Sequence, residues 1–233
     1  MNGAQTRPQP PGTAGFTLIE LLVAMGLLGI LLVVIMQLQG GATRTTASLM
    51  TAGQRIEEQN AAVTYISDRF RGSVGWAVPA TLTLNGASCT LPSTDGLCMA
   101  FVTPETTYGD TSGDITRYVL LAYRVENRTG FTDRRPDAWA DAESSKVIRE
   151  YRYVLPCGGA CTAVSVSVPT GTTWSSAVVA DGFTLTGVGG TIKPFVLDRN
   201  KLTLTVRSQF VDGGTKKYFP PSSNTVNTVN RRN

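Results

Sequence analysis

A run of 21 residues with a single charged side chain, from Phe16 to Met36, is the feature that most limits how this chain can fold. At about 1.5 Å per residue, a helix of this length crosses the roughly 30 Å hydrocarbon core of a bilayer. A secretory signal has a shorter apolar stretch, and its small-residue cleavage site follows that stretch. Here the small residues Ala14 and Gly15 come before the run. The sequence therefore predicts a membrane-spanning helix that the mature chain retains.

Glu20 is the one charged residue in this run. A carboxylate in a membrane helix costs on the order of 2.5–3.5 kcal/mol on insertion scales, and less near an interface. Glu20 lies in the first turn or so of the predicted helix, where the helix dipole favours an anion. Two interpretations stay open. The charge is either tolerated at the membrane interface, or it meets a cation when the helix leaves the lipid.

The segment GFTLIELLVA, residues 15–24, resembles the prepilin processing motif of type IV pilins and type II secretion pseudopilins. The motif combines Gly15, the following Phe16, Glu20 four residues later and an unbroken apolar helix. The resemblance implies that a prepilin peptidase cuts between Gly15 and Phe16, and that the new amine of Phe16 is methylated. It also implies that Glu20 pairs with the Phe16 amine of a neighbouring subunit, since a buried carboxylate needs a cation.

Further features resemble PilW-type minor pilins and J-type pseudopilins. They are the segment YISDRFR at 65–71, the chain end NRRN at 230–233, the length of the globular part and the absence of proline between Phe16 and Val78. The resemblance implies a minor pilin, a structural subunit that helps to initiate or cap a type IV pilus for twitching motility, adhesion or DNA uptake. A minor pseudopilin of a type II secretion system is the first alternative. A single-pass membrane-anchored binding domain is the more remote one.

Such a subunit implies partners and a location. The implied partners are other pilin subunits through the N-terminal helix, the prepilin peptidase, the inner-membrane assembly platform and, before assembly, the lipid bilayer. The implied location is the inner (cytoplasmic) membrane, crossed once with the globular domain outside the cytoplasm, and then a cell-surface pilus or periplasmic pseudopilus. The short basic cluster of Arg128, Arg134 and Arg135 could contact DNA phosphates. Asp133 and Asp137 interrupt that cluster, which favours a mixed-charge surface loop without support for DNA.

Apolar or small residues continue after the span at steps of three, four or seven, which is the spacing of one helical face. They are Leu38, Ala42, Thr45, Leu49, Ala52, Ile56, Val63, Ile66 and Phe70. The pattern predicts one helix from 16 to about 71 that stops near Gly72, with Arg55 off its apolar stripe. The pair Gly40–Gly41 is expected to loosen the helix, because glycine has a low helix propensity.

From residue 80 onward the pattern changes to alternation, which is typical of strands. Strands are predicted at 81–84, 99–103, 117–125, 147–155, 162–168, 183–186, 192–197 and 201–210, with a hairpin to 216–219 and a short last strand at 225–229. The predicted fold class is α+β, a long N-terminal helix packed on an antiparallel β-sheet domain. The expected divisions are a leader at 1–15, a span at 16–36, an amphipathic helix at 37–71 and a globular domain at 72–233.

The four cysteines are Cys89, Cys98, Cys157 and Cys161. An even count behind an export-type N-terminus favours disulfides. Zinc is the rival interpretation, but neither spacing matches the usual C-x2-C knuckle. Four cysteines allow three pairings. We predict Cys89 with Cys98 and Cys157 with Cys161, because each pair brackets a turn-rich loop.

The chain contains no histidine, which removes the commonest general base and the commonest metal ligand. We therefore expect a non-enzymatic protein without a cofactor. Asp110 and Asp114, with Glu105 nearby, form an oxygen-rich turn that could hold Ca²⁺, but the spacing of a twelve-residue calcium loop is missing. A solvated turn is the favoured interpretation, so no metal is expected.

Overall fold

Helix α1 (Leu18–Arg71) is the first element of the computed structural model, which describes residues 17–105, 117–128, 145–155, 166–169, 171–212 and 214–232. The chain divides into two compact units, Met1–Ser48 and Leu49–Asn233, and α1 contributes to both. The end of the helix at Arg71 is the predicted one. The expected loosening at Gly40–Gly41 is not found, since the helix runs on through both residues. Each glycine costs roughly 1 kcal/mol relative to alanine, which a long cooperative helix tolerates.

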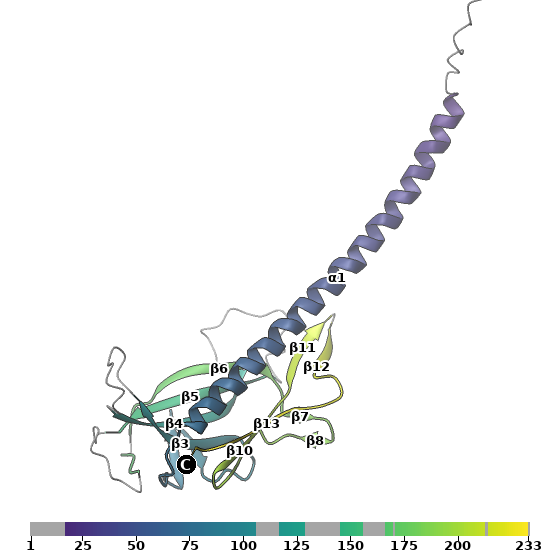
Figure 1. Ribbon diagram of the computed structural model, residues 1–233. Coiled ribbons are helices and arrows are strands. Elements are labelled where there is room, and N and C mark those ends of the chain that lie inside the picture. Colours follow the sequence, from purple (N-terminus) through teal and green to yellow (C-terminus); the bar gives the residue numbers. More distant parts are fainter. Residues whose placement is uncertain are drawn as a thin grey trace, which may run out of the picture. The chain divides into compact units, whose positions relative to one another are not determined.

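Within the described residues, a six-stranded antiparallel sheet forms the centre of the second unit (Figure 1). Its strands are β3 (Cys98–Glu105), β4 (Arg117–Asn127), β5 (Lys146–Val154), β6 (Ser175–Phe183), β11 (Ser208–Asp212) and β12 (Thr215–Phe219). They lie in the order β12-β11-β6-β5-β4-β3, and β3 to β6 follow one another as a meander. The fold is therefore α+β, as predicted.

A smaller antiparallel sheet of three described strands lies in the order β13-β10-β9. These strands are β9 (Phe195–Asp198), β10 (Lys201–Val206) and β13 (Thr225–Asn230). Two short hairpins join β1 (Thr81–Leu84) to β2 (Ala87–Thr90) and β7 (Thr186–Gly187) to β8 (Gly190–Thr191).

The strand predicted at 201–210 is two strands, and they belong to different sheets. The break falls at Arg207, whose side chain is buried. Arg207 donates hydrogen bonds of 3.1 and 2.6 Å to the carbonyls of Pro220 and Pro221. Its backbone carbonyl accepts a 2.8 Å bond from the N–H of Thr184. These contacts fix the bend between β10 and β11, so the predicted continuous strand is wrong.

Three other strand predictions also differ from the structure. The described part of 162–168 is not a strand, and the N–H of Val166 instead bonds to the carbonyl of Ala77 at 2.9 Å. Phe183 ends β6 where a strand was expected to begin, and Ile192 lies before β9. The sequence did not predict β2 or β6, because their segments ASCT and SSAVVADGF are rich in small and polar residues and lack clear alternation.

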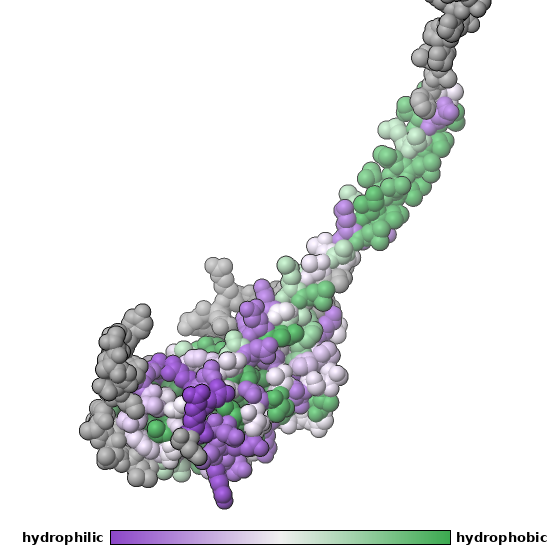
Figure 2. Space-filling model, viewed as in Figure 1, coloured by the Kyte–Doolittle hydropathy of each residue, from purple (hydrophilic) through white to green (hydrophobic). Residues whose placement is uncertain are grey.

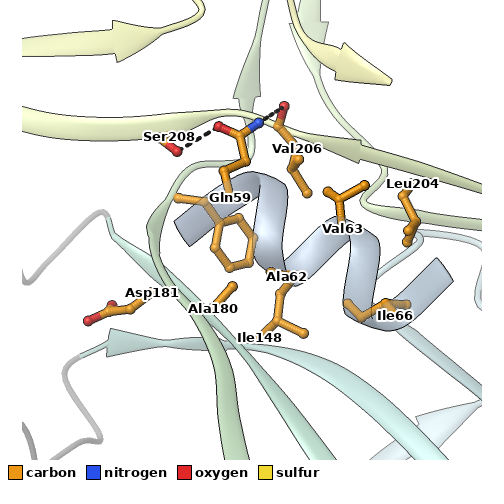
Figure 3. Close-up of a pocket in the computed structure, with 11 residues that line it drawn as sticks. Gln59, Ala62, Val63, Ile66, Ile148, Ala180, Asp181, Leu204, Val206 and Ser208 are labelled. Atoms are coloured by element: carbon orange, nitrogen blue, oxygen red, sulfur yellow. Dashed lines mark hydrogen bonds between the residues drawn. The ribbon is translucent and has the colours of Figure 1, made fainter. Parts of the chain in front are cut away.

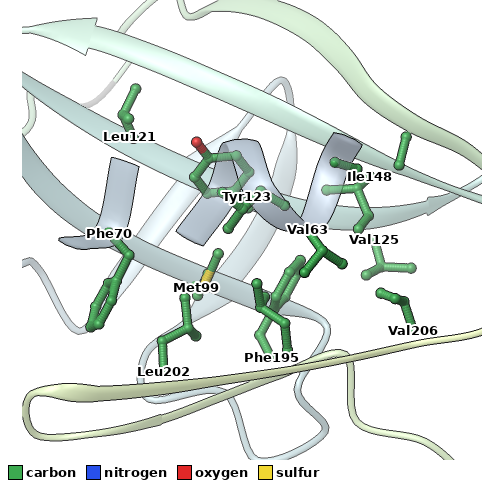
Figure 4. Close-up of a cluster of buried hydrophobic side chains, with 14 of the residues drawn as sticks. Val63, Phe70, Met99, Leu121, Tyr123, Val125, Ile148, Phe195, Leu202 and Val206 are labelled. Carbon is green, nitrogen blue, oxygen red and sulfur yellow. The ribbon is translucent and has the colours of Figure 1, made fainter. Parts of the chain in front are cut away.

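The core lies on both faces of the six-stranded sheet. On one face, the end of α1 and the three-stranded sheet cover Met99, Leu121 and Tyr123 (Figure 4). On the other face, the β1–β2 hairpin and Trp174 cover Leu120. Adjacent residues of β4 thus point to opposite faces, as the pleat of a strand requires. The six-stranded sheet is therefore buried on both faces.

The buried face of α1 is partly polar, which the sequence did not indicate. Arg55 was predicted to lie off the packed stripe, but it is only 6% exposed. Ile56 and Leu49 were predicted on that stripe, yet they are 42% and 66% exposed. The buried stripe contains Ala52, Arg55, Gln59, Ala62, Val63, Ile66, Ser67 and Phe70. Its spacing is helical, but three of its members, Arg55, Gln59 and Ser67, are polar side chains with polar partners.

Gln59 hydrogen-bonds to the sheets, whereas Arg55 forms a 3.0 Å ion pair with Glu58 of its own helix and packs against β6. The side-chain amide of Gln59 donates a 3.2 Å hydrogen bond to the carbonyl of Val206, and the hydroxyl of Ser208 donates a 2.7 Å bond to its oxygen (Figure 3). The guanidinium of Arg55 lies against Gly182, where φ is +71°. A Cβ at residue 182 would lie 2.9 Å from Nη1 of Arg55. Both the dihedral and the close approach explain glycine at this position.

Candidate functional site

Helix α1 begins with a capping box formed by Thr17 and Glu20. The backbone N–H and the hydroxyl of Thr17 each donate a 3.0 Å hydrogen bond to the Glu20 carboxylate. The N–H of Glu20 in turn faces Oγ1 of Thr17 at 3.4 Å. These reciprocal bonds satisfy N–H groups that the start of a helix leaves without partners. The T-x-x-E spacing is a sequence signal for this arrangement that the sequence analysis missed.

The apolar part of α1 is exposed on all sides in the single chain. Leu18–Thr43 is long and apolar enough to cross a membrane, and none of it is buried. Figure 2 shows the hydrophobic colour over this part of the helix. A helix that is apolar all round is stable only when something covers it, because so large an apolar surface is unfavourable in water. Lipid tails or other apolar helices can supply that cover.

Glu20 therefore lies at the N-terminal end of an uncovered apolar helix. Its carboxylate is exposed in the single chain. The capping bonds hold the carboxylate at the helix start, and its remaining lone pairs can accept a hydrogen bond from an approaching cation. The Glu20 carboxylate can therefore make one specific polar contact on an otherwise apolar helix surface. Apolar contacts alone do not select one position of a neighbouring helix.

The family model described as the prokaryotic N-terminal methylation motif matches residues 11–36. This chain carries that motif. The matched residues include Gly15, Phe16 and Glu20, and the match is consistent with type IV pilins and pseudopilins. The motif, the apolar helix and the antiparallel sheets together fit a pilin-like protein that is anchored in a membrane. No curated protein and no solved structure matches the chain.

Several predicted site residues lie outside the described residues. They are Gly15 and Phe16 of the processing site, Cys157 and Cys161 of the second predicted disulfide, and Asp110 and Asp114 of the candidate calcium turn. These interpretations stay predictions. Within the described part of the chain, no group of three or more His, Cys, Asp and Glu residues is placed to hold a metal ion.

Cys89 and Cys98 form the predicted local disulfide, with their Cα atoms 5.9 Å apart. The bond links β2 to β3, and both cysteines are buried in the core on the face of the six-stranded sheet that the β1–β2 hairpin covers. Asp95 organises the loop between them. It accepts hydrogen bonds from the Ser93 hydroxyl and from the N–H of Leu97 at 3.0 Å. These bonds lower the pKa of the Asp95 carboxyl, because they favour its charged form.

Two buried polar pairs in the second unit contribute to packing. Arg128, a candidate phosphate contact in the sequence, bonds to the carboxylate of Asp181 at 3.0 and 3.2 Å. The hydroxyl of Tyr123 donates a 2.6 Å hydrogen bond to Glu150. Burial, together with the negative charge of Glu150, raises the pKa of Tyr123. Arg128 is therefore engaged inside the domain, and this contradicts its use in a surface contact with phosphates.

Proposed function

We propose that this protein is a minor type IV pilin, made as a membrane-anchored precursor and then built into a filament. The observation that carries the proposal is the methylation motif at the start of a helix whose apolar part is uncovered. In the membrane, lipid covers that helix. In the filament, the helices of other subunits replace the lipid, while the sheet domain faces outward.

Processing would prepare the contact that sets the position of each subunit. A prepilin peptidase removes residues 1–15, and the new N-terminus of Phe16 is a methylated cationic amine. Glu20 of one subunit then binds the Phe16 amine of its neighbour. An unpaired carboxylate among packed apolar helices is strongly unfavourable, so the position that brings the two charges together is preferred over other registers. The span at 16–36, the helix at 37–71 and the domain at 72–233 have separate roles in this scheme.

Mass spectrometry of the mature protein tests this proposal. The expected N-terminal peptide begins at Phe16 and carries a methyl group on its amine. A Gly15→Leu variant serves as the matched control, because it changes only the last leader residue and should remain unprocessed. A wild-type protein that keeps Met1, or one that is cut after residue 36, would contradict the pilin interpretation.

Pseudopilins of type II secretion systems carry the same motif. The location of the protein in the cell therefore distinguishes a pilus subunit from a pseudopilus subunit. A minor pilin is expected in pili that are sheared from the cell surface. Its presence in the membrane fraction alone, together with a secretion defect in the deletion strain, would instead indicate a pseudopilus.

A further inference from the structure

A groove lies between the edges of the two larger sheets. Strand β3 ends the six-stranded sheet and β9 ends the three-stranded sheet, and no described strand pairs with the outer edge of either. The two strands meet where the N–H of Phe195 donates a 3.0 Å hydrogen bond to the carbonyl of Gly96. Next to this point both strands line one pocket of about 400 Å³, which we call the edge groove. It is formed by residues 98–100 of β3, residues 195–197 and 199, residues 91–93, and Val78.

The outer edge of β3 has backbone groups without a partner. Hydrogen bonds alternate along an antiparallel pair, and the bond from the N–H of Val125 to the carbonyl of Leu97 assigns the odd-numbered residues to β4. The even-numbered residues therefore point outward. The carbonyl of Val102 accepts a 2.8 Å bond from the segment that follows α1. The outward N–H and C=O groups of Cys98 and Ala100 have no partner among the described residues.

The outer edge of β9 has the same pattern. The N–H of Thr205 donates a 3.0 Å bond to the carbonyl of Pro194, so the even-numbered residues face β10. Phe195 and Leu197 therefore point outward. The N–H of Phe195 is paired with Gly96, whereas no described group pairs with the N–H and C=O of Leu197. Both sheets thus present unpaired backbone groups to the edge groove.

The unpaired groups on β3 belong to buried residues. Cys98 is 6% exposed and Ala100 is 2% exposed. Buried backbone N–H and C=O groups are nearly always paired in native proteins, because an unpaired one is unfavourable. The backbone of an added strand matches these groups, since its own donors and acceptors also repeat every two residues. This repeat favours a peptide strand over a small ligand.

The edge groove runs between the two cores of the domain, so its sides are apolar. Val78 and Leu91 pack against the core under the β1–β2 hairpin, and Leu197 packs against the core beneath α1. Val196 is 44% exposed. Successive side chains of a strand point to opposite faces, so both faces of an added strand would meet apolar side chains. The part of β3 beside the groove, from 96 to 102, is about 20 Å long at ~3.3 Å per residue, which suits a strand of about five residues.

Arg199 is the one charged side chain among the described residues that line the edge groove. It is exposed in the turn after β9, where its φ is +51°. No described carboxylate forms an ion pair with it. A single cation at the end of an apolar groove complements an acidic side chain on the bound segment.

We propose that the edge groove binds an extended segment of a partner protein, which adds as a strand between β3 and β9. The segment has apolar side chains on both faces and an acidic side chain that contacts Arg199. Its backbone pairs with Cys98, Ala100 and Leu197, so that one continuous sheet replaces two edges. The inference concerns the folded domain alone, so its failure would leave the minor pilin proposal unchanged.

The test uses the full chain in neutral detergent and a fluorescent synthetic peptide of about six residues. The peptide alternates valine and alanine and ends in aspartate. Its matched control has the same side chains but carries N-methyl groups on alternate backbone nitrogens, which removes the hydrogen-bond donors of one edge. A third peptide ends in lysine instead of aspartate. Fluorescence anisotropy measures the affinity, and hydrogen exchange followed by NMR locates the bound peptide.

We expect the aspartate peptide to bind and to slow the exchange of the Ala100 and Leu197 N–H groups. The N–H of Met99 faces β4 and should exchange at an unchanged rate. The N-methylated peptide should bind roughly tenfold or more weakly, because it loses backbone hydrogen bonds. No binding of the aspartate peptide, equal binding of the N-methylated one, or binding without slower exchange at Ala100 and Leu197 would overturn the proposal.

The variant Arg199→Asn tests the charge, because asparagine also tolerates a positive φ. It should bind the aspartate peptide roughly two- to fivefold more weakly and should not lose affinity for the lysine peptide. Lys217→Asn on β12 is the matched control, since it removes the same charge outside the groove, and thermal unfolding checks that each protein is folded. Equal losses in the variant and the control would contradict the role of Arg199. Slow exchange of the Ala100 N–H in the free protein, whether constant or increasing with protein concentration, would mean that the chain or a second copy already fills the groove, and it would also overturn the proposal.

Discussion

Replacing Gln59 by alanine tests the polar contact between α1 and the β10–β11 bend. Gln59 is 7% exposed, and its amide bonds to the Val206 carbonyl at 3.2 Å and to the Ser208 hydroxyl at 2.7 Å. These contacts join residues that are 147 and 149 positions apart in the chain. The contact therefore fixes which turn of the helix meets the bend between the two sheets.

The structure allows an estimate of the loss. Each hydrogen bond contributes about 0.5–1.5 kcal/mol net, and a buried acceptor left without a donor costs a further 1–3 kcal/mol. Alanine recovers a few tenths of a kcal/mol through its higher helix propensity. We expect Gln59→Ala to lower the free energy of unfolding by about 2–4 kcal/mol. Gln54→Ala, at an exposed position of the same helix, should change it by less than about 0.5 kcal/mol.

Equilibrium urea unfolding of the full chain in mild detergent provides the measurement, with tryptophan fluorescence as the signal. Trp174 is buried in the core under the β1–β2 hairpin and Trp76 packs against that core, so both report on the folded domain. The double variant Gln59→Ala with Ser208→Ala should be less destabilised than the sum of the single variants, because both remove the same bond. A loss below about 0.5 kcal/mol for Gln59→Ala, or strict additivity in the double variant, would refute the reasoning.

Two further predictions concern Glu20 and the disulfide. Glu20→Ala should insert into the membrane normally but should not enter filaments, because the cation of the neighbouring subunit loses its partner. Filament shearing and immunoblotting measure this, with Glu57→Ala as the control, and normal incorporation would mean that Glu20 is a tolerated charge. Replacing Cys89 and Cys98 by serine should cost about 2–3 kcal/mol in urea unfolding, as expected for a short closed loop. Non-reducing peptide mapping should find the two cysteines linked in the wild type, and free thiols at both positions would contradict the structure.

The regular parts of the fold could be predicted from the sequence. The helix end at Arg71 follows from the loss of helical spacing and from Gly72. Strand β4, the β11–β12 hairpin and the last strand β13 follow from alternation and turn residues. Cys89 and Cys98 pair as the local spacing suggested. These features depend on residues that are close in the chain, so local patterns were sufficient.

The features that sequence reasoning missed depend on contacts between distant residues. The sequence pattern predicts that Arg55 faces solvent. Gly182, which lies 127 positions later in the chain, leaves room for its guanidinium, so Arg55 is buried. Strand β6 has a weak pattern of its own and is held by its pairing with β5. The hydrogen bond from the N–H of Arg232 to the carbonyl of Arg71 likewise depends on the fold, because 161 positions separate the two residues. No local pattern indicates any of these.

Strand β13 has a consequence for how the protein is made. It contributes Val229 to the core that α1 and the three-stranded sheet form on the six-stranded sheet, and Arg232 beyond it donates to the last turn of α1. The domain thus needs residues after position 225 in order to close around a helix that ends at Arg71. Folding of the domain is complete only after the ribosome has made β13. A nascent chain that stops before β13 leaves the end of the helix uncapped and a gap in the core.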